Sequence, residues 1–286
     1  MTTLKNNQIK AVIIDLDGTT LNKNSKISKE NKTAIKEALK KNIIVIIATG
    51  RGPSRVKKIY SKLNIDKYNY ASVCFNGALT LDFNNSKIIS SITMNKIQSK
   101  DIFLMAFKYD LKIWGYDEST NNVIYNSKKN WFIYLLFRSY HLKEIKFNSK
   151  KYNHRIFKFS FIGEKLNLSH FMKEVASKYS VTFFKHKIFK NFFLWEITNS
   201  KVDKSIAIEK LLNNLNLQWS NVFAIGDGHN DIKMIQKAQI GVTLKNAIDE
   251  TKQQADYVTD YCKNNGLAKA INKFILNKNE NYFKTS

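Results

Sequence analysis

The ten residues KAVIIDLDGT, which run from Lys10 to Thr19, decide the fold. The short apolar run predicts a buried strand over Lys10–Leu16, and acidic residues with a glycine end it. Two carboxylates, those of Asp15 and Asp17, therefore stand at the carboxyl end of this strand. In open parallel sheets, functional groups gather at the carboxyl ends of the strands. The stretch thus suggests both a fold class and the position of a site.

Strands and helices alternate along the first and last quarters of the chain. We expect a helix after Ser28, a strand at Ile43–Ala48, a helix over residues 56–63 and a strand at Tyr70–Phe75. In the last quarter we expect a helix over 204–215, a strand at Val222–Ile225, a short helix to about Ala238, and strands near 240–244 and 256–259. Such alternation predicts an α/β protein with a Rossmann-like parallel sheet and helices on both faces.

The middle of the chain has a different pattern. The expected elements there are a hairpin near Asn84-Asn85, a strand at Arg155–Ile162, a helix at Leu168–Tyr179 and a strand at Phe192–Ile197. This pattern predicts an inserted α+β domain over residues 84–200. The core domain would then consist of residues 1–83 and 201–286.

The net charge of +24, from 47 Lys and Arg against 23 Asp and Glu in 286 residues, raises the possibility of nucleic-acid binding. Only four of the basic residues are arginines, and the lysines are spread along the chain among many Asn and Ile residues. We therefore favour compositional drift over selection for a polyanion. The segment Lys128–Lys158, where aromatic and basic residues interleave, is the best local case for a nucleic-acid surface. Its apolar spacing favours an amphipathic helix that packs on the insertion itself.

The remaining composition bears on the compartment. A hydrophobic content of 43% excludes a disordered chain, and the two cysteines, Cys74 and Cys262, cannot build a disulfide framework. The longest apolar run, Trp131–Phe137, is too short to span a bilayer, and Asp15 interrupts the only apolar stretch near the N-terminus. We expect a cytoplasmic protein with no membrane association.

Polar signals follow three of the expected strands. They are Asp15–Thr19, Thr49-Gly50-Arg51, and the stretch GDGHND at residues 226–231. The carboxylates of Asp15, Asp17, Asp227 and Asp231 would converge at one edge of the sheet. Two carboxylates about 4 Å apart repel by about 4 kcal/mol at an effective dielectric near 20, so such a cluster protonates or binds a cation. Oxygen ligands with room for water and phosphate suit Mg²⁺.

These motifs resemble those of the haloacid dehalogenase-like (HAD) superfamily. The matching features are D-x-D-G-T at 15–19, the strand-terminal Thr49, a helix-borne Lys204, G-D-x-x-N-D at 226–231, Asn76-Gly77-Ala78, Asn246-Ala247 and the stretch ADYVT at 255–259. The set is similar to the Cof-type subgroup, class IIB, and covers nearly the whole chain. Because 31 residues separate Asp17 from Thr49 and Lys204 comes 155 positions after Thr49, the insertion resembles a C2-type cap.

The resemblance implies a role for each matching residue. Asp15 would be the nucleophile that forms an aspartyl-phosphate, and Asp17 the general acid and then base. Thr49 would hold phosphate oxygens, and Lys204 would neutralise the charged intermediate. The residues expected to contact phosphate or substrate are Gly50, Arg51, Asn76, Gly77, Asn230 and Asn246. The residues expected to hold Mg²⁺ are Asp15, Asp17 through its carbonyl, Asp227 and Asp231.

Two of these assignments have alternatives. Asn230 and Asp231 could instead support the site, at the water shell of the metal or by orienting Lys204. The family usually has Gly where this chain has Ser205, so Lys201, three residues away from Lys204, is an alternative for the lysine.

The resemblance implies a Mg²⁺-dependent phosphatase of small phosphomonoesters, such as sugar phosphates, that acts as a monomer or homodimer. Asp17 favours phosphoester chemistry, because P-type ATPase relatives carry Thr there and the dehalogenases lack the pair. A phosphomutase of the same fold, similar to phosphomannomutase, is the first alternative. A basic nucleic-acid-binding protein is the alternative from another class, and the less favoured one.

Overall fold

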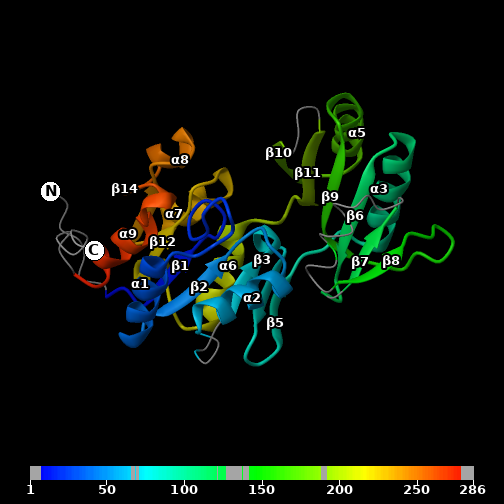
Figure 1. Cartoon of the computed structure of the whole chain (residues 1–286). Helices are drawn as coiled ribbons and strands as arrows, with labels where there is room; N and C mark the ends of the chain where they lie inside the picture. The colour runs from blue at the N-terminus through cyan, green and yellow to red at the C-terminus, as the bar shows by residue number, and fades with distance from the viewer. Residues whose placement is uncertain are drawn as a thin grey trace. The chain divides into compact units, whose positions relative to one another are not determined.

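The computed structural model describes residues 8–65, 68, 71–120, 122–126, 137, 142–187 and 192–277. The chain forms two compact units, the first made of Met1–Arg51, Val56–Ser90 and Asp203–Ser286, and the second of Gly52–Arg55 and Ser91–Val202. Figure 1 shows a sheet with flanking helices in each unit.

The first unit is built on an eight-stranded sheet. Its strands, in spatial order, are β14 (Tyr257–Thr259), β13 (Ile240–Leu244), β12 (Val222–Ile225), β1 (Ala11–Ile14), β2 (Ile44–Ala48), β3 (Ala71–Cys74), β4 (Leu79–Asp82) and β5 (Lys87–Ser91). All pairings from β14 to β3 are parallel, and β4 is antiparallel to β3. The central strands β1 and β12 are buried along their whole length, as expected for strands covered on both faces.

Helices cover this sheet. They are α1 (Lys29–Lys40), α2 (Pro53–Leu63), α6 (Lys204–Asn214), α7 (Ile232–Lys237), α8 (Asp249–Gln253) and α9 (Gly266–Phe274), with short 3₁₀ turns η1 (Phe75–Gly77), η2 (Trp219–Asn221), η3 (His229–Asp231) and η4 (Cys262–Asn264). Apolar residues of α6 and α7 share one core cluster with Ala11 and Ile13 of β1. The helix after Ser28 is confirmed, and the Ser28 hydroxyl accepts a hydrogen bond from the Asn31 amide at its first turn.

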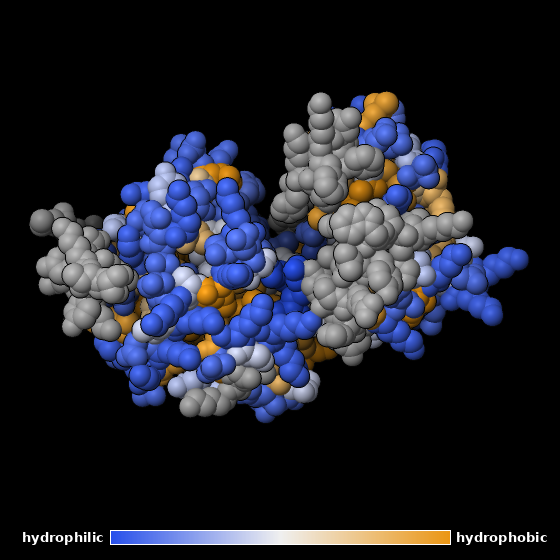
Figure 2. Space-filling model, viewed as in Figure 1, coloured by the Kyte–Doolittle hydropathy of each residue, from blue (hydrophilic) through white to orange (hydrophobic). Residues whose placement is uncertain are grey.

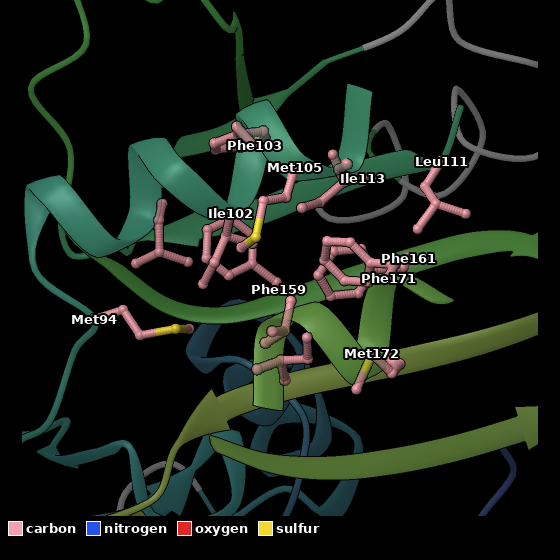
Figure 3. Packing of buried hydrophobic residues seen from close by; sticks show 14 of the residues in the cluster. Met94, Ile102, Phe103, Met105, Leu111, Ile113, Phe159, Phe161, Phe171 and Met172 are labelled. Atoms are coloured by element: carbon pink, nitrogen blue, oxygen red, sulfur yellow. The ribbon is translucent and has the colours of Figure 1, made fainter. Parts of the chain in front are cut away.

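The second unit contains a six-stranded, mostly antiparallel sheet. Its strands, in spatial order, are β10 (Val181–Lys187), β11 (Phe192–Asn199), β9 (Ile156–Glu164), β6 (Lys112–Asp117), β7 (Asn122–Tyr125) and β8 (Lys143–Lys146). Helices α3 (Lys96–Lys108) and α5 (Lys165–Lys178) pack on it. Figure 3 shows the aromatic centre of this core, where Phe103 of α3, Phe159 and Phe161 of β9 and Phe171 of α5 lie together. Each fully buried aromatic side chain of this kind contributes about 1.5–3 kcal/mol to folding.

The expected α/β class, with a parallel-sheet core and an additional α+β domain, is confirmed. The hairpin near Asn84-Asn85 is present between β4 and β5, but its strands lie in the sheet of the first unit, where the Ser90 hydroxyl donates to the Thr80 hydroxyl at 3.1 Å. The boundaries at 83/84 and 200/201 stay predictions.

The surface bears on whether the protein binds a nucleic acid or a membrane. Hydrophilic side chains make up most of the coloured part of the face seen in Figure 2. Within the described ranges, no helix is long and apolar enough to cross a membrane. Four of the eight aromatic residues of the basic segment Lys128–Lys158 lie outside the described residues, as does most of Trp131–Phe137. Phe137 itself is buried and packs edge-on against Trp114.

Candidate active site

The parallel register brings the three polar strand ends to one edge of the first sheet. Ile14, the last residue of β1, pairs with Ile47 of β2 on one side and with Ile225 of β12 on the other. The residues that follow, Asp15, Thr49 and Asp227, therefore leave the sheet at the same edge. This is the carboxyl edge, where ligands bind in open α/β sheets.

Lys204 connects two buried carboxylates at this edge. Its Nζ lies 3.0 Å from Asp15 Oδ1 and 2.5 Å from Asp231 Oδ1, and its side chain is fully buried. Burial by itself would lower the pKa of Lys204, but the two carboxylates raise it above its ordinary value. Lys201, the alternative lysine, is exposed. The structure therefore places Lys204, and not Lys201, against Asp15.

Helix α6 begins at Lys204, and two neighbours hold its first turn in place. The Asp203 carboxylate caps the helix by accepting from the backbone amides of Ser205 and Ile206. The turn before β4 passes so close that a Cβ on Gly77, whose φ is +107°, would lie 2.5 Å from the Asp203 carbonyl oxygen. Only glycine fits there, and this close approach fixes where the lysine enters the site.

The pKa of Asp15 is raised well above its ordinary value. Burial is the main cause, Lys204 opposes it, and the carboxylates of Asp231 and Asp227 add to it. Burial and Asp231 likewise raise the pKa of Asp227 to about 6. A hydrogen bond from the Thr19 hydroxyl to Asp227 Oδ1, at 2.9 Å, acts in the opposite direction and lowers this pKa. The cluster thus holds more negative charge than its single ammonium group balances.

Asp231 uses both carboxylate oxygens within the protein. Oδ1 accepts from Lys204, and Oδ2 accepts from the backbone amides of Asp227 and Gly228 at 3.1 and 3.0 Å. These bonds fold the loop after β12 around the carboxylate and orient the lysine. Of the roles that the sequence leaves open for Asp231, this geometry favours the orientation of Lys204.

Asp17 has a different environment from the other three acids. Its carboxylate is largely exposed and forms a two-point ion pair with Arg51, in which Nε lies 2.7 Å from Oδ2 and Nη2 contacts Oδ1. The Arg51 side chain is only 10% exposed. The carboxylate of Asp17 is not part of the acidic cluster, which consists of Asp15, Asp227 and Asp231.

The turn after β2 is held by the turn after β3. The amide of Phe75 donates to the Arg51 carbonyl and the amide of Asn76 to the Thr49 carbonyl, both at 3.0 Å. Phe75, Asn76 and Gly77 all have positive φ, a strained arrangement that points the buried Asn76 amide oxygen at Asn230 Nδ2, 2.8 Å away. A Cβ on Gly50 would lie 3.1 Å from the side-chain amide of Asn76, so a larger residue there would require that amide to shift by a few tenths of an ångström.

Asn246, expected to contact substrate, bonds instead to backbone groups of two loops. Its Nδ2 donates to the Gly18 carbonyl at 2.9 Å, and its Oδ1 accepts from the Cys262 amide at 2.7 Å. His229 is exposed on the neighbouring turn η3.

Comparison with known families identifies the family to which this chain belongs. The model of the haloacid dehalogenase-like hydrolases matches residues 12–271. The chain belongs to this family. The resemblance seen in the motifs is confirmed, and the protein is an enzyme of the hydrolase class.

Individual relatives align with this chain over nearly their whole length. The 5-amino-6-(5-phospho-D-ribitylamino)uracil phosphatase YcsE of Bacillus subtilis is 29% identical over 278 residues, which cover 94% of this chain and 96% of that protein. A solved HAD-like hydrolase from Bacteroides thetaiotaomicron, 21% identical, superposes with a TM-score of 0.82 over 94% of this chain and all of that one. The HAD subclass IIB sugar phosphatase BT4131, 20% identical, gives 0.72 over 93% and 98%.

The residues of this HAD-like hydrolase fit a divalent cation. Within the part of the chain that the structure describes, Asp15, Asp227 and Asp231 offer carboxylate oxygens that lie within 4.8 Å of one another. Hard oxygen donors and excess negative charge suit Mg²⁺. Gly18, with φ at +82°, leaves space for the Asp227 carboxylate, because a Cβ there would lie 2.2 Å from Asp227 Oδ2.

Three threonines support the site without having been expected from the sequence. Besides Thr19, the hydroxyls of Thr243 and Thr251 donate to the carbonyls of Gly226 and Gly228 at 2.8 and 3.1 Å. Thr19 lies inside the D-x-D-G-T motif and could have been found there. Thr243 and Thr251 give no signal except that both are polar and fully buried.

Proposed function

We propose that the protein is a Mg²⁺-dependent phosphatase that hydrolyses small phosphomonoesters through an aspartyl-phosphate on Asp15. The observation that carries the proposal is the contact between the buried Asp15 carboxylate and Lys204. A second carboxylate, that of Asp17, lies two residues from Asp15 on the same loop and is exposed. A nucleophile and an acid/base group so placed suit a two-step displacement.

In the first step, an oxygen of Asp15 attacks phosphorus while the bond from phosphorus to the alcohol oxygen breaks. Asp17 gives its proton to the departing oxygen. In the second step, Asp17 takes a proton from water, the water oxygen bonds to phosphorus, and the bond to Asp15 breaks to release phosphate. Lys204 neutralises charge at Asp15 throughout.

Arg51 occupies the carboxylate that would act as the acid/base group. Both oxygens of Asp17 contact the guanidinium, so the ion pair must open before Asp17 can reach the leaving oxygen. An anionic phosphate is the natural competitor for Arg51, in keeping with the substrate-contacting role expected for it. The backbone of Thr49 and Gly50 lies beside Arg51 and would contact the same phosphate.

Mg²⁺, when bound, would offset the negative charge of the phosphoryl group and of the acidic cluster. Asp15, Asp227 and the backbone carbonyl of Asp17 would hold it. Asp231 would act behind them, because both of its oxygens are engaged by Lys204 and by backbone amides.

The substrate class rests on the relatives. One is named for a phosphorylated ribityl compound and a structural neighbour for sugar phosphates. We therefore propose a small phosphorylated metabolite of the sugar-phosphate type. The cytoplasmic location and the monomeric or dimeric state stay predictions.

The test is a screen of phosphorylated metabolites and a generic aryl phosphate for phosphate release with Mg²⁺. We expect hydrolysis that disappears with EDTA and in Asp15→Asn, and that persists in the control Asp249→Asn, whose side chain is 87% exposed. Conversion of a hexose 1-phosphate without phosphate release would identify a phosphomutase instead. Binding of RNA or DNA at 150 mM salt, with no turnover of any phosphomonoester, would support the nucleic-acid alternative.

A further inference from the structure

Asn246 connects the loop that carries the acid/base group to a loop from the far end of the chain. It lies two residues after β13, and the two hydrogen bonds of its side-chain amide run to Gly18 and Cys262, 228 and 16 positions away. The Cys262 thiol also donates to the Leu21 carbonyl, at 3.4 Å. Two residues from the last part of the chain, Asn246 and Cys262, therefore hold the 17–21 loop at the carbonyls of Gly18 and Leu21.

Gly18 is the residue whose conformation matters most in this loop. Its φ of +82° and the closeness of Asp227 leave no space for a side chain. Its amide donates to the Leu21 carbonyl at 3.3 Å, and its carbonyl accepts from Asn246. Fixing both peptide planes of Gly18 also fixes the direction of the Asp17 carbonyl, which shares one of those planes.

We propose that Asn246 is a positioning residue, which orients the Asp17–Gly18 backbone instead of contacting substrate. This inference rests on the proposed function for its kinetic and Mg²⁺-binding consequences only. An asparagine is suited to the task, because its amide holds an NH₂ donor group and a carbonyl acceptor at a fixed distance from each other. The donor satisfies a carbonyl and the acceptor satisfies an amide, so the side chain closes a bridge between two backbones.

The substitution Asn246→Asp separates the two roles. It keeps the shape and the acceptor for Cys262 but replaces the donor by an oxygen that repels the Gly18 carbonyl. We expect kcat to fall by about tenfold or more, since small displacements of reacting groups are costly, with KM for an aryl phosphate changed by less than about twofold. Asn246→Ala should show the same split, and the exposed control Asn213→Asp should leave both constants unchanged.

A second measurement does not depend on catalysis. Hydrogen–deuterium exchange at the amides of residues 18–21 should speed up in Asn246→Asp and in Asn246→Ala relative to wild type, and stay unchanged in Asn213→Asp. The rise in melting temperature on adding Mg²⁺ should be smaller in both Asn246 variants.

The outcomes distinguish this inference from the proposed function. A raised KM with unchanged kcat, or unchanged exchange in the 18–21 loop, would overturn the positioning role. If wild type releases no phosphate from any substrate, the proposed function fails, and the exchange data alone still decide whether Asn246 holds the loop. If Asn246→Asp does not fold, the milder Asn246→Ala supplies both readouts.

Discussion

The ammonium group of Lys204 lies 3.0 Å from the carboxylate of Asp15, although 189 positions separate the two residues. Both are buried, and Asp231 is the second carboxylate that shares the lysine. A buried charge is stable only where a partner balances it, so the three side chains form one unit in which each depends on the others.

Removing the lysine should therefore destabilise the protein as well as inactivate it. Lys204→Met leaves two buried carboxylates without their cation, which costs about 3–5 kcal/mol in unfolding free energy at pH 7. The double variant Lys204→Met/Asp231→Asn should recover part of that loss. Urea denaturation checks this prediction, and exposed Lys201→Met serves as the control, expected within about 0.5 kcal/mol of wild type. Equal stabilities for Lys204→Met and wild type would contradict the assigned pairing.

The acidic cluster should make the metal-free protein less stable as pH rises. The pKa of Asp227 is raised by burial and by Asp231 to about 6, whereas a carboxyl in the unfolded chain titrates near about 3.9. The folded state thus binds this proton more tightly, and the contribution to stability that is complete below pH ~4 is lost as pH rises through ~6. At pH 8, Asp227→Asn should be about 1–3 kcal/mol more stable than wild type without metal.

Under the proposed function Mg²⁺ should reverse that order, because Asp227 would be one of its ligands and the variant lacks that carboxylate. Denaturation of wild type and Asp227→Asn at pH 4, 6 and 8, with and without Mg²⁺, measures both effects. Asp249→Asn, on the exposed start of α8, should show neither. A stability difference that does not change with pH would show that Asp227 is not held in its protonated form by its surroundings.

Breaking the ion pair of Arg51 with Asp17 should lower the catalytic efficiency without lowering the stability of the protein. Asp17 is largely exposed, and exposed pairs contribute only about 0–1 kcal/mol to folding. Arg51→Gln should leave the melting temperature nearly unchanged and lower kcat/KM by at least about tenfold, mainly through KM, because a phosphate ligand is lost. Arg155→Gln, at the exposed pair with Glu118, is the control. Normal kinetics in Arg51→Gln would exclude Arg51 from the site.

Gly77 should tolerate no side chain. A Cβ at this position meets the Asp203 carbonyl, and φ is positive, so Gly77→Ala must displace the first turn of α6. We expect a loss of a few kcal/mol in stability, on the order of 2, together with reduced activity because Lys204 moves with the helix. Calorimetry and phosphate release test the two parts. Wild-type stability in Gly77→Ala would show that the close approach is relaxed in solution.

The sequence predicts the first unit well because its signals are local. Apolar runs such as Ala11–Ile14 end at acidic residues, and parallel strands put those ends at one edge. The meeting of Asp15, Asp227 and Asp231 follows from that rule. The arginine partner of Asp17 does not follow from it, since either residue could equally have faced solvent.

The second unit was harder to predict because its strands do not alternate cleanly. Lys158 is buried in the middle of β9 and Glu196 is partly buried in β11, where their side chains form an ion pair at 2.7 Å. A pattern of hydrophobicity cannot anticipate such a pair. The contacts of Asn246 with backbone carbonyl and amide groups are likewise invisible in the sequence, because backbone partners have no signature.

The proposed mechanism has Asp15 carry the phosphoryl group. Its most direct test is to quench a single turnover with acid, reduce the protein with borohydride, which converts an aspartyl-phosphate to homoserine, and map the peptides by mass spectrometry. Asp17→Asn, which slows hydrolysis of the intermediate, should increase the yield. We expect homoserine at position 15 and nowhere else. Modification at another residue, or none during phosphate release, would contradict it.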